Sequence, residues 1–365
     1  MRLVIAGGGT GGHLFSGVAV WDHIAKKSDV DCEALFIGTK NGIEAEVLPK
    51  LGLPHAFIPV TKFRRSGIFS KLQSASVLPF SFASAVFLLL RFRPHVVLGV
   101  GGYAAGPVCL ASALLGIPTA IIEQNAAPGF TNRVLGKWVE KIFLGLPGGE
   151  DRFPRHRAEF VGNPVREALF SLPDVGEIAG KFAVLAFGGS QGAQKINELV
   201  TGAFEHLGEH RASVRFIHLT GRHDYRWVKE AYERVGVDGD VFEFRNDMEN
   251  VYRMAHWVIS RSGALTVSEL AASGRPSLLI PYPFAVDDHQ EKNAAYLVEA
   301  GGAVMARQAS LSSEKVAAMI IDALANREGI NAMGKKAKSC GKPDAAAKIA
   351  GWIAEKGKET NDKKI

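Results

Sequence analysis

The sequence predicts an α/β protein built from two domains, each with a parallel sheet covered by helices. Short apolar runs alternate with amphipathic segments along the 365 residues, as in proteins whose parallel strands are connected by helices. Glycine clusters follow several of the apolar runs, which indicates tight turns from strand to helix. The pattern of strand, glycine-rich loop and helix begins near residue 3 and begins again near residue 182, which predicts two domains of ordinary size.

The expected elements follow one another regularly in both halves. In the first half, strands are expected at residues 3–6, 34–37, 55–58, 96–99, 120–123 and 141–144, with helices at 18–25, 44–51 and 108–115. In the second half, strands are expected at 182–187, 216–220, 241–244, 257–260, 277–280 and 303–305. Two Rossmann-like domains facing a cleft are the expected arrangement, because open parallel sheets bind ligands at the carboxyl ends of their strands.

The domain boundaries are expected where these patterns change. The first domain is expected to span residues 1–162 and the second residues 163–341. Residues 342–365 are expected to form a C-terminal helix that follows Pro343, with apolar residues at helical spacing.

Composition narrows the classes of function. The formal net charge of +6 favours an anionic partner, but no basic helix or aromatic–basic stripe indicates nucleic acid. The three cysteines are widely spaced and are expected to be reduced thiols, with no metal-binding spacing among them. The N-terminal apolar run is too short for a signal peptide, and no segment is expected to span a membrane.

The first glycine loop, Gly7-Gly8-Gly9-Thr10-Gly11-Gly12-His13, follows the first strand and opens a helix. Backbone amides of such a loop, with the helix N-terminus, favour a phosphate. The loop also fits the dinucleotide pattern GxGxxG, but the second strand ends without the acid that would hold a ribose, which disfavours a dehydrogenase. His13 is a candidate base, kept neutral by the helix N-terminus; a packing or capping histidine is the alternative.

The other candidate residues also lie where strands meet helices. A second loop, Gly101-Gly102-Tyr103 with its neighbours, predicts a pyrophosphate site together with the first. In the second half, the loop at residues 188–192 with Ser190 is a further anion cradle, and Glu269 could accept from both hydroxyls of a ribose. Gln290 could recognise sugar hydroxyls, and Arg166 could clamp a diphosphate. Their alternatives are a helix cap and a surface arginine.

Two Asp-x-Asp sequences, Asp29-Val30-Asp31 and Asp238-Gly239-Asp240, look like the metal-binding motif of one class of glycosyltransferase. Both are expected in polar turns away from the glycine loops. The prediction is therefore that the chain holds no metal.

The ordered set of these segments, together with Glu123-Gln124-Asn125, resembles the MurG family, the N-acetylglucosaminyltransferases of bacterial peptidoglycan synthesis. The resemblance covers nearly the whole chain. It implies the GT-B fold, with the last helix crossing back to the first domain, and an inverting reaction that needs no metal or other cofactor. It also implies transfer of N-acetylglucosamine from UDP-N-acetylglucosamine to the 4-hydroxyl of undecaprenyl-pyrophosphoryl-N-acetylmuramyl-pentapeptide.

The resemblance assigns roles to the candidate residues. The donor contacts that it implies are Thr10, Gly11, Gly12, Asn125, Arg166, Ser190, Arg245 (through its backbone), Ala264, Leu265, Thr266, Val267, Ser268, Glu269 and Gln290. The acceptor pyrophosphate would be bound by Gly8, Gly9, Gly101, Gly102 and Tyr103. The sequence departs from the family at Ile122, where the family usually has histidine, and at Ser16, where it usually has proline. The first departure leaves His13 as the expected base.

A membrane surface is a further expected partner. Lys62, Arg64, Arg65 and Lys71 precede the apolar segment 77–90, and Arg91 and Arg93 follow it, which suits docking on an anionic leaflet. A core helix with charged ends is the alternative. The expected location is the cytoplasmic face of the bacterial inner membrane, with other cell-wall synthesis enzymes as possible partners.

Three other functions remain open on sequence grounds. They are a GT-B enzyme with another lipid acceptor, a UDP-sugar 2-epimerase, and a non-catalytic UDP-sugar binding protein. The acceptor-side loops and Glu123-Gln124-Asn125 argue against the first, and the predicted second phosphate site argues against the third, since a binding protein needs none. The epimerase shares the expected architecture and would be revealed by release of free N-acetylmannosamine.

Overall fold

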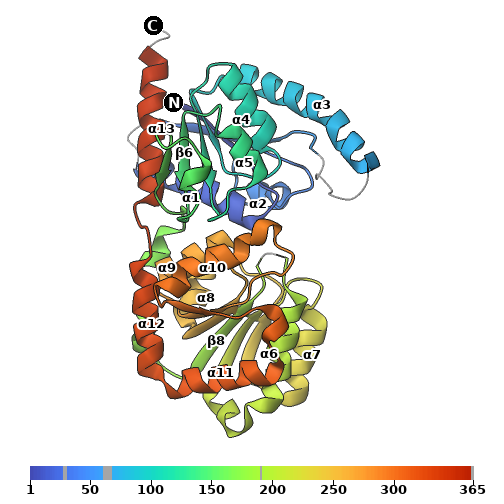
Figure 1. The fold of residues 1–365 in the computed structure, drawn as a ribbon, viewed down its shortest axis with the longest axis vertical. Helices are drawn as coiled ribbons and strands as arrows, with labels where there is room; N and C mark the ends of the chain where they lie inside the picture. The colour runs from blue at the N-terminus through green and yellow to red at the C-terminus, as the bar shows by residue number, and fades with distance from the viewer. Residues whose placement is uncertain (28–30, 61–67, 190, 363–365) are drawn as a thin grey trace. The chain divides into compact units, whose positions relative to one another are not determined.

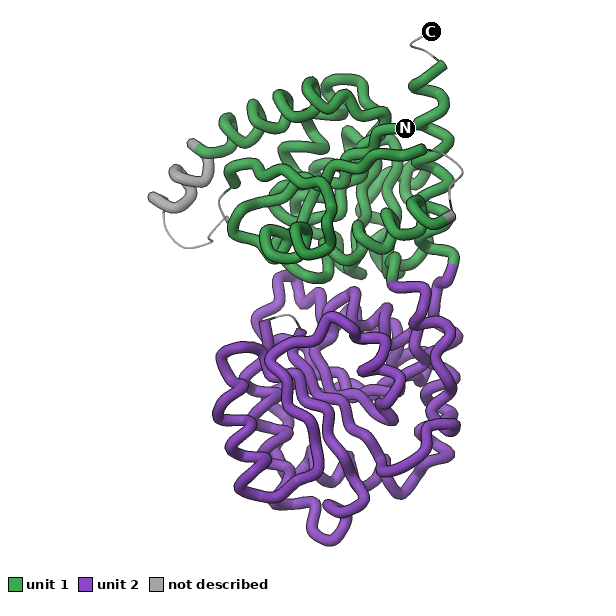
Figure 2. The backbone as a smooth tube through the Cα atoms, turned by 180° about the vertical axis from the view of Figure 1, so that it is seen from behind, with its two compact units in different colours: residues 1–165, 344–365 green, residues 166–343 purple. Residues whose placement is uncertain are grey.

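The computed structural model describes residues 1–27, 31–60, 68–189 and 191–362. The described part of the chain divides into two compact units (Figures 1 and 2). Unit 1 comprises residues 1–165 and 344–365, and unit 2 comprises residues 166–343.

Within its described residues, unit 1 contains a seven-stranded parallel sheet in the order β3-β2-β1-β4-β5-β6-β7. The strands are β1 (Arg2–Ala6), β2 (Glu33–Gly38), β3 (His55–Phe57), β4 (Val96–Gly99), β5 (Thr119–Glu123), β6 (Lys141–Leu144) and β7 (Ala158–Phe160). Ala6 pairs with Gly99 across β1 and β4. The loops that follow these two strands therefore leave the sheet side by side.

Unit 2, over the residues described, contains a six-stranded parallel sheet in the order β10-β9-β8-β11-β12-β13. The strands are β8 (Phe182–Phe187), β9 (Val214–Leu219), β10 (Gly239–Phe242), β11 (Trp257–Ser260), β12 (Ser277–Leu279) and β13 (Ala303–Met305). Phe187 pairs with Ser260 across β8 and β11, so the loops that follow these strands are neighbours too. Both units thus have the Rossmann-like fold expected from the sequence.

Helices connect the strands in both units (Figure 1). In unit 1 they are α1 (Gly11–Lys27), α2 (Glu44–Lys50), α3 (Ile68–Phe92), α4 (Ala105–Leu114), α5 (Phe130–Leu135) and α13 (Ala345–Asp362). In unit 2 they are α6 (Gln194–Ala203), α7 (Tyr225–Val235), α8 (Met248–Met254), α9 (Ala264–Ser273), α10 (His289–Glu299), α11 (Ser313–Ala325) and α12 (Arg327–Ser339).

Two element boundaries differ markedly from the prediction, and one strand was not predicted. Helix α1 begins at Gly11, within the glycine loop, and not near residue 18. Strand β10 begins at Gly239 and not at residue 241; Asp238, just before it, and Asp240, within it, form ion pairs with Lys181 and Arg215 while staying half exposed. Strand β7 was not predicted, since its three residues carry too little apolar pattern to be distinguished from a loop.

The C-terminal helix α13 completes unit 1. Ile349 and Ile353 are fully buried and belong to the same core cluster as Leu3 and Ile5 of β1. The indole of Trp352 meets Phe143 of β6 edge to face, with ring centroids 6.1 Å apart. Helix α13 also packs against α1, so the far end of the sequence forms part of the N-terminal unit, as the resemblance implied.

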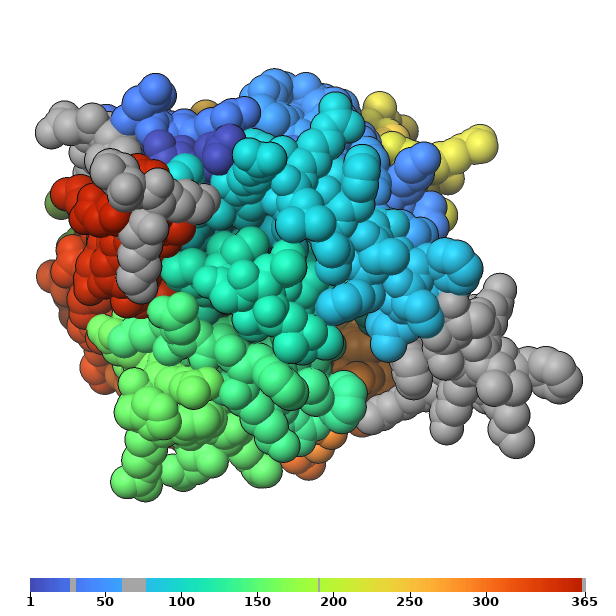
Figure 3. Space-filling view, turned by 90° about the horizontal axis from the view of Figure 1, so that it is seen from above, coloured from blue at the N-terminus to red at the C-terminus, as the bar shows by residue number. Residues whose placement is uncertain are grey.

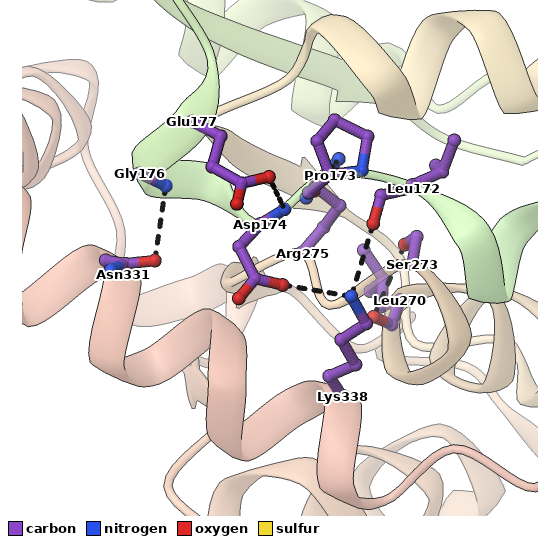
Figure 4. Close-up of polar contacts among 10 residues, drawn as sticks. All are labelled: Leu172, Pro173, Asp174, Gly176, Glu177, Leu270, Ser273, Arg275, Asn331 and Lys338. Atoms are coloured by element: carbon purple, nitrogen blue, oxygen red, sulfur yellow. Dashed lines mark hydrogen bonds and ion pairs between the residues drawn. The ribbon is translucent and has the colours of Figure 1, made fainter.

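A group of buried polar contacts fixes the segment with which unit 2 begins (Figure 4). The guanidinium of Arg275 is fully buried and donates to the carbonyl oxygen of Pro173 from both terminal nitrogens, at 3.0 Å each. Lys338 of α12 donates to the carbonyl of Leu172 at 3.2 Å and to the carboxylate of Asp174 at 2.9 Å. These contacts hold residues 172–174 against the C-terminal ends of α9 and α12.

Candidate active site

The two glycine loops of unit 1 interlock at the carboxyl ends of β1 and β4. The amide of Gly8 donates to the carbonyl oxygen of Gly101 over 3.1 Å. Gly102 has a φ of +81°, and a Cβ there would overlap the backbone of Gly8, so another residue would separate the loops. The structure therefore brings together the residues predicted to bind the acceptor. Tyr103 lies partly exposed beside them.

His13 lies in the first turn of α1 and faces the second loop. A Cβ on Gly101 would stand 3.0 Å from Nδ1, 3.1 Å from Cε1 and 3.2 Å from Cδ2 of the imidazole. The ring thus covers the bare backbone of Gly101. Nδ1 is buried and has no hydrogen-bond partner among the described residues.

The electrostatics of His13 favour the neutral imidazole. Burial lowers the pKa of His13 to about 4, and the negative charge of Glu44 opposes this shift. A neutral ring is able to accept a proton, although a base with so low a pKa is weaker than one near the working pH. Any anion that binds at the loops would raise the pKa of His13 toward that range.

Glu44 is a site residue that the sequence reasoning missed. It begins α2 and is fully buried. Its carboxylate accepts from the amide of Gly9 at 2.6 Å and from the amide and hydroxyl of Thr39 at 2.8 Å each. The amide of Gly9 is therefore already bonded to a carboxylate. Glu44 thereby links the first glycine loop to Thr39, which follows β2.

The segment Glu123-Gln124-Asn125 ends β5 and is tied down by hydrogen bonds. The buried carboxylate of Glu123 accepts from the Asn125 amide at 3.0 Å, the Gly129 amide at 2.9 Å and Nδ2 of Asn132 at 2.9 Å. Burial raises the pKa of Glu123, and these donors oppose the shift. Nε2 of Gln124 donates to the carbonyl of Val100 at 2.8 Å, which fixes the segment to the second glycine loop.

In unit 2, the loop after β8 lies beside the loop after β9. The amide of Gly192 donates to the carbonyl of Gly189 at 3.0 Å, and Gly192 contacts the backbone at Thr220 and Gly221 too closely to leave room for a side chain. Ser190, a predicted donor contact, lies outside the described residues.

Helix α9 holds the residues predicted to contact the donor. It begins at Ala264 after Gly263, which has extended backbone angles, so the amides of its first turn have no intrahelical partners. Ala264, Val267 and Ser268 are buried, and Leu265 and Thr266 are partly exposed. Glu269 lies in the second turn and not in the first, so it is not a helix-start acid of the kind that the sequence allowed.

The carboxylate of Glu269 is partly buried and has a defined setting. The hydroxyl of Tyr252 donates to its Oε2 at 3.1 Å. Burial raises the pKa of Glu269 to about 7; the charge of Arg166 and the Tyr252 hydroxyl pull it down, and the charge of Glu249 pushes it up. Arg166, the predicted diphosphate clamp, forms an ion pair with Glu249 at 2.6 Å.

Gln290 lies in the first turn of α10, next to a strained turn. Its Oε1 accepts from the amide of Tyr282 at 2.9 Å, and its carbonyl accepts from Ser262 at 2.8 Å. Asp287 and Asp288 have φ values of 54° and 50°, in the left-handed region that residues other than glycine seldom adopt. Gln290 is thus linked to the loop that opens α9.

The side chain of Arg245 is already engaged by neighbouring residues, so only its backbone is left for the predicted donor contact. It forms an ion pair with Asp247, which lowers the pKa of that carboxyl, and its guanidinium lies 4.7 Å from the ring centroid of Phe242.

The remaining predicted donor contacts lie in unit 1. Thr10 is exposed, Gly11 and Gly12 begin α1, and Nδ2 of Asn125 donates to the carboxylate of Glu123.

The described residues do not place three or more His, Cys, Asp or Glu side chains together where they could hold a metal ion. Of the two Asp-x-Asp sequences, Asp238 and Asp240 are each paired with a cationic side chain. Asp29 and Val30 lie outside the described residues.

Comparison with known families matches both units. Residues 3–144 match the glycosyltransferase family 28 N-terminal domain, and residues 183–349 match the glycosyltransferase family 28 C-terminal domain. A UDP-N-acetylglucosamine–N-acetylmuramyl-(pentapeptide) pyrophosphoryl-undecaprenol N-acetylglucosamine transferase of Myxococcus xanthus is 42% identical over 96% of this chain and 91% of its own length. An enzyme of the same name from Geobacter sp. is 40% identical over 100% of this chain and 98% of its own.

Solved structures give the same result for the fold. The crystal structure of Acinetobacter baumannii MurG matches with a TM-score of 0.75 at 28% identity, over 97% of this chain and 99% of that one. A UDP-GlcNAc 2-epimerase from Neisseria meningitidis matches with a TM-score of 0.69 at 14% identity, over 97% of this chain and 100% of that one. The second likeness concerns the fold alone.

Proposed function

The chain belongs to glycosyltransferase family 28, and from this premise we propose how its two units share one transfer reaction. The enzyme transfers N-acetylglucosamine from UDP-N-acetylglucosamine to undecaprenyl-pyrophosphoryl-N-acetylmuramyl-pentapeptide, a step of peptidoglycan synthesis. The observation that carries this function is identity of 40–42% with enzymes of that name along nearly the whole chain. Through cell-wall synthesis, the activity bears on cell shape and division.

Unit 2 binds the donor. Glu269 accepts from the ribose hydroxyls, Arg166 and the amides at the start of α9 contact the diphosphate, and Gln290 contacts the sugar. The uracil meets backbone near Arg245, whose side chain is already engaged by Asp247. Ser190 is proposed as a further diphosphate contact from its place in the sequence. Arg166 has to turn from Glu249 toward the ligand when the donor binds.

Unit 1 binds the acceptor. The interlocked loops that carry Gly8, Gly101 and Gly102 bind the acceptor pyrophosphate, and Tyr103 lies at their edge. Gly9 contributes less than the sequence indicated, because its amide is bonded to Glu44. Thr10, Gly11, Gly12 and Asn125 contact the donor sugar when the two substrates meet.

The transfer is an inverting displacement. The 4-hydroxyl of the N-acetylmuramyl residue attacks the anomeric carbon, the bond from that carbon to the UDP oxygen breaks, and UDP leaves from the opposite face. His13 takes the hydroxyl proton as the new bond forms. Negative charge that grows on the diphosphate is met by Arg166 and by the helix N-termini of unit 2.

The membrane surface is met by one side of unit 1. Helix α3 exposes Leu78, Phe80, Phe87 and Leu90, and α4, which packs beside it, exposes Leu114. Figure 3 looks onto the surface of unit 1 to which these two helices contribute, in light blue and blue-green. Arg91 and Arg93 are exposed at the end of the helix. Such an apolar face with basic neighbours suits peripheral binding to an anionic leaflet, which we place at the cytoplasmic face of the membrane.

Lys62, Arg64 and Arg65 lie outside the described residues. Within the apolar segment 77–90, Phe82 packs against the core of unit 1, whereas Phe80 and Phe87 are exposed. The described helices include none long and apolar enough to cross a membrane.

The deciding experiment measures UDP release from UDP-N-acetylglucosamine with and without the lipid-linked muramyl-pentapeptide. The expected result is UDP release that requires the acceptor, with the labelled sugar recovered on the lipid. Release that needs only diacylglycerol would indicate another lipid glycosyltransferase, and free N-acetylmannosamine would indicate an epimerase. In the same assay, His13→Ala should lower turnover far more than UDP binding. Equal losses in both would refute the role of His13.

A further inference from the structure

Tyr252, at the end of α8, is a fully buried residue for which neither the sequence pattern nor the proposed chemistry gives a role. Its hydroxyl reaches out of the core of unit 2 to Oε2 of Glu269, 3.1 Å away. Its ring meets Phe187 edge to face, with centroids 6.2 Å apart. Phe187 is the last residue of β8, directly before the Gly188–Gly192 loop. Tyr252 therefore connects two segments of the donor site.

The backbone of Tyr252 is fixed as firmly as its side chain. Its carbonyl oxygen accepts from Nε of Arg275 at 2.6 Å, and the same guanidinium donates to Pro173. Figure 4 shows Arg275 beside Pro173, in the group that also includes Lys338 and Asp174. The main chain of Tyr252 is thus held by Arg275 and its ring packs against Phe187. These two contacts fix the position from which its hydroxyl donates to Glu269.

We propose that Tyr252 is a positioning residue for the donor, whose hydroxyl holds one oxygen of Glu269 so that the other is presented to the ribose. This inference rests on the proposed role of Glu269. A carboxylate on a helix can rotate about three side-chain torsions, and a fixed donor on one oxygen removes most of that freedom before the ligand arrives.

The charges around Glu269 give the hydroxyl a second effect. Three groups face the carboxylate: Arg166 from the start of unit 2, and Glu249 and Tyr252 from α8. Burial raises the pKa of Glu269 to about 7, while the Tyr252 hydroxyl lowers it by bonding to the charged form. Loss of the Tyr252 hydroxyl would leave a larger fraction of Glu269 protonated at neutral pH. A protonated carboxyl is a weaker hydrogen-bond acceptor for the ribose hydroxyls.

The test compares Tyr252→Phe with the wild-type enzyme in binding UDP and 2′-deoxy-UDP, by titration calorimetry between pH 6 and pH 9. Because a carboxylate that is no longer oriented loses part of its hydrogen bonding to the ribose, we expect UDP to bind roughly 5- to 20-fold more weakly. The 2′-deoxy ligand should lose less, roughly threefold or under, since it makes fewer bonds to Glu269. The pH midpoint for UDP binding should move upward.

Two controls separate positioning from general damage. Tyr232→Phe removes the hydroxyl of another fully packed tyrosine of unit 2, one whose partner is His218, and should change binding of neither ligand. Glu269→Gln should weaken UDP binding more than 2′-deoxy-UDP binding. Thermal unfolding of all three variants confirms that they are folded.

The outcomes are distinct. Equal losses of both ligands in Tyr252→Phe, or an unmoved pH midpoint, would overturn the positioning role while leaving the ribose contact of Glu269 intact. Equal losses of affinity for UDP and 2′-deoxy-UDP in Glu269→Gln would overturn the ribose contact of Glu269, and with it the positioning role of Tyr252. That result would leave the transfer activity of the family unaffected.

Discussion

The imidazole of His13 lies so close to the backbone of Gly101 that a Cβ there would stand 3.0 Å from its Nδ1, closer than an ordinary van der Waals contact. This relationship joins a residue on α1 to a loop that is almost 90 residues away in sequence. It makes the position of the candidate base depend on the absence of a side chain in the second loop. Gly101 also has a φ of +87°, which residues with a side chain seldom adopt.

Gly101→Ala should therefore impair catalysis through His13. The new methyl group would displace the ring and strain the loop, and a displacement of the base of about 1 Å costs roughly 100-fold in kcat. UDP binding should stay unchanged, because its proposed contacts lie in unit 2. Steady-state kinetics and UDP titration check this. A variant with normal kcat would show that His13 need not stay where it lies.

Glu44→Ala should destabilise unit 1. The substitution leaves the amides of Gly9 and Thr39 and the Thr39 hydroxyl without their buried acceptor, which costs roughly 2–4 kcal/mol in free energy of unfolding. Denaturant unfolding measures the change. The matched control is Glu46→Ala in the same helix, whose exposed pair with Lys50 should contribute less than about 1 kcal/mol. Similar losses for both would contradict the supporting role of Glu44.

Glu269→Gln should stabilise the protein, and more so at higher pH. The pKa of Glu269 is raised from its ordinary 4.5 to about 7 in the folded state. Between these values the folded protein binds a proton that the unfolded chain releases, so the stability owed to this group is lost as pH rises through 7. Thermal unfolding at pH 5.5 and pH 8 measures the gain. A gain of equal size at both pH values would argue against an elevated pKa.

Glu249→Gln should tighten UDP binding. It weakens the 2.6 Å ion pair that holds Arg166, and it removes a charge that raises the pKa of Glu269. The first effect favours the diphosphate contact of Arg166 and the second the ribose contact of Glu269, and we expect affinity to rise roughly three- to tenfold. Glu230→Gln, which loses an exposed pair with Arg226, should have no effect on UDP binding. Weaker binding in Glu249→Gln would mean that the pair orients Arg166 for the ligand.

Replacing Phe80 and Phe87 together by Ser should abolish binding to anionic vesicles. Their side chains are 70% and 61% exposed, so the change removes apolar membrane contact without opening the core. Wild-type binding should also weaken as salt is added. The control is Phe284→Ser in unit 2, where the ring is 78% exposed. If this control lost as much binding as the double variant, the proposed face would be wrong.

The regular parts of the fold could be predicted from the sequence because the strands are buried on both faces. Such strands appear as short apolar runs, and the loops after β1 and β8 follow these runs as clusters of glycine. Short or polar elements were less visible. The start of strand β10 carries Asp240, directly after Asp238 and Gly239, and this sequence resembles a turn until the cationic partners of the two aspartates on neighbouring segments are known.

The candidate site shows the same limit at the level of single residues. Gly101, Glu269 and Gln290 stand out because they follow strands or open helices. Glu44 looks like an ordinary acid in a helical first turn, and what reveals it is burial against Gly9 and Thr39, which are brought near by the fold. Tyr252 looks like a core residue, and its hydroxyl bond to Glu269 bridges two helices. Neither contact leaves a local pattern in the sequence.

Because α13 supplies Ile349 and Ile353 to the core of unit 1, that unit cannot complete its core until these residues have been synthesised, after all of unit 2. When residues 1–165 have been synthesised, the strands β1–β7 of the unit 1 sheet are complete, but α13, which packs against this unit, has not yet been made. Unit 2, whose residues are contiguous, has all of its own segments earlier. The order of synthesis and the order of completion are therefore reversed, and nascent chains stalled before α13 would display apolar surface to chaperones.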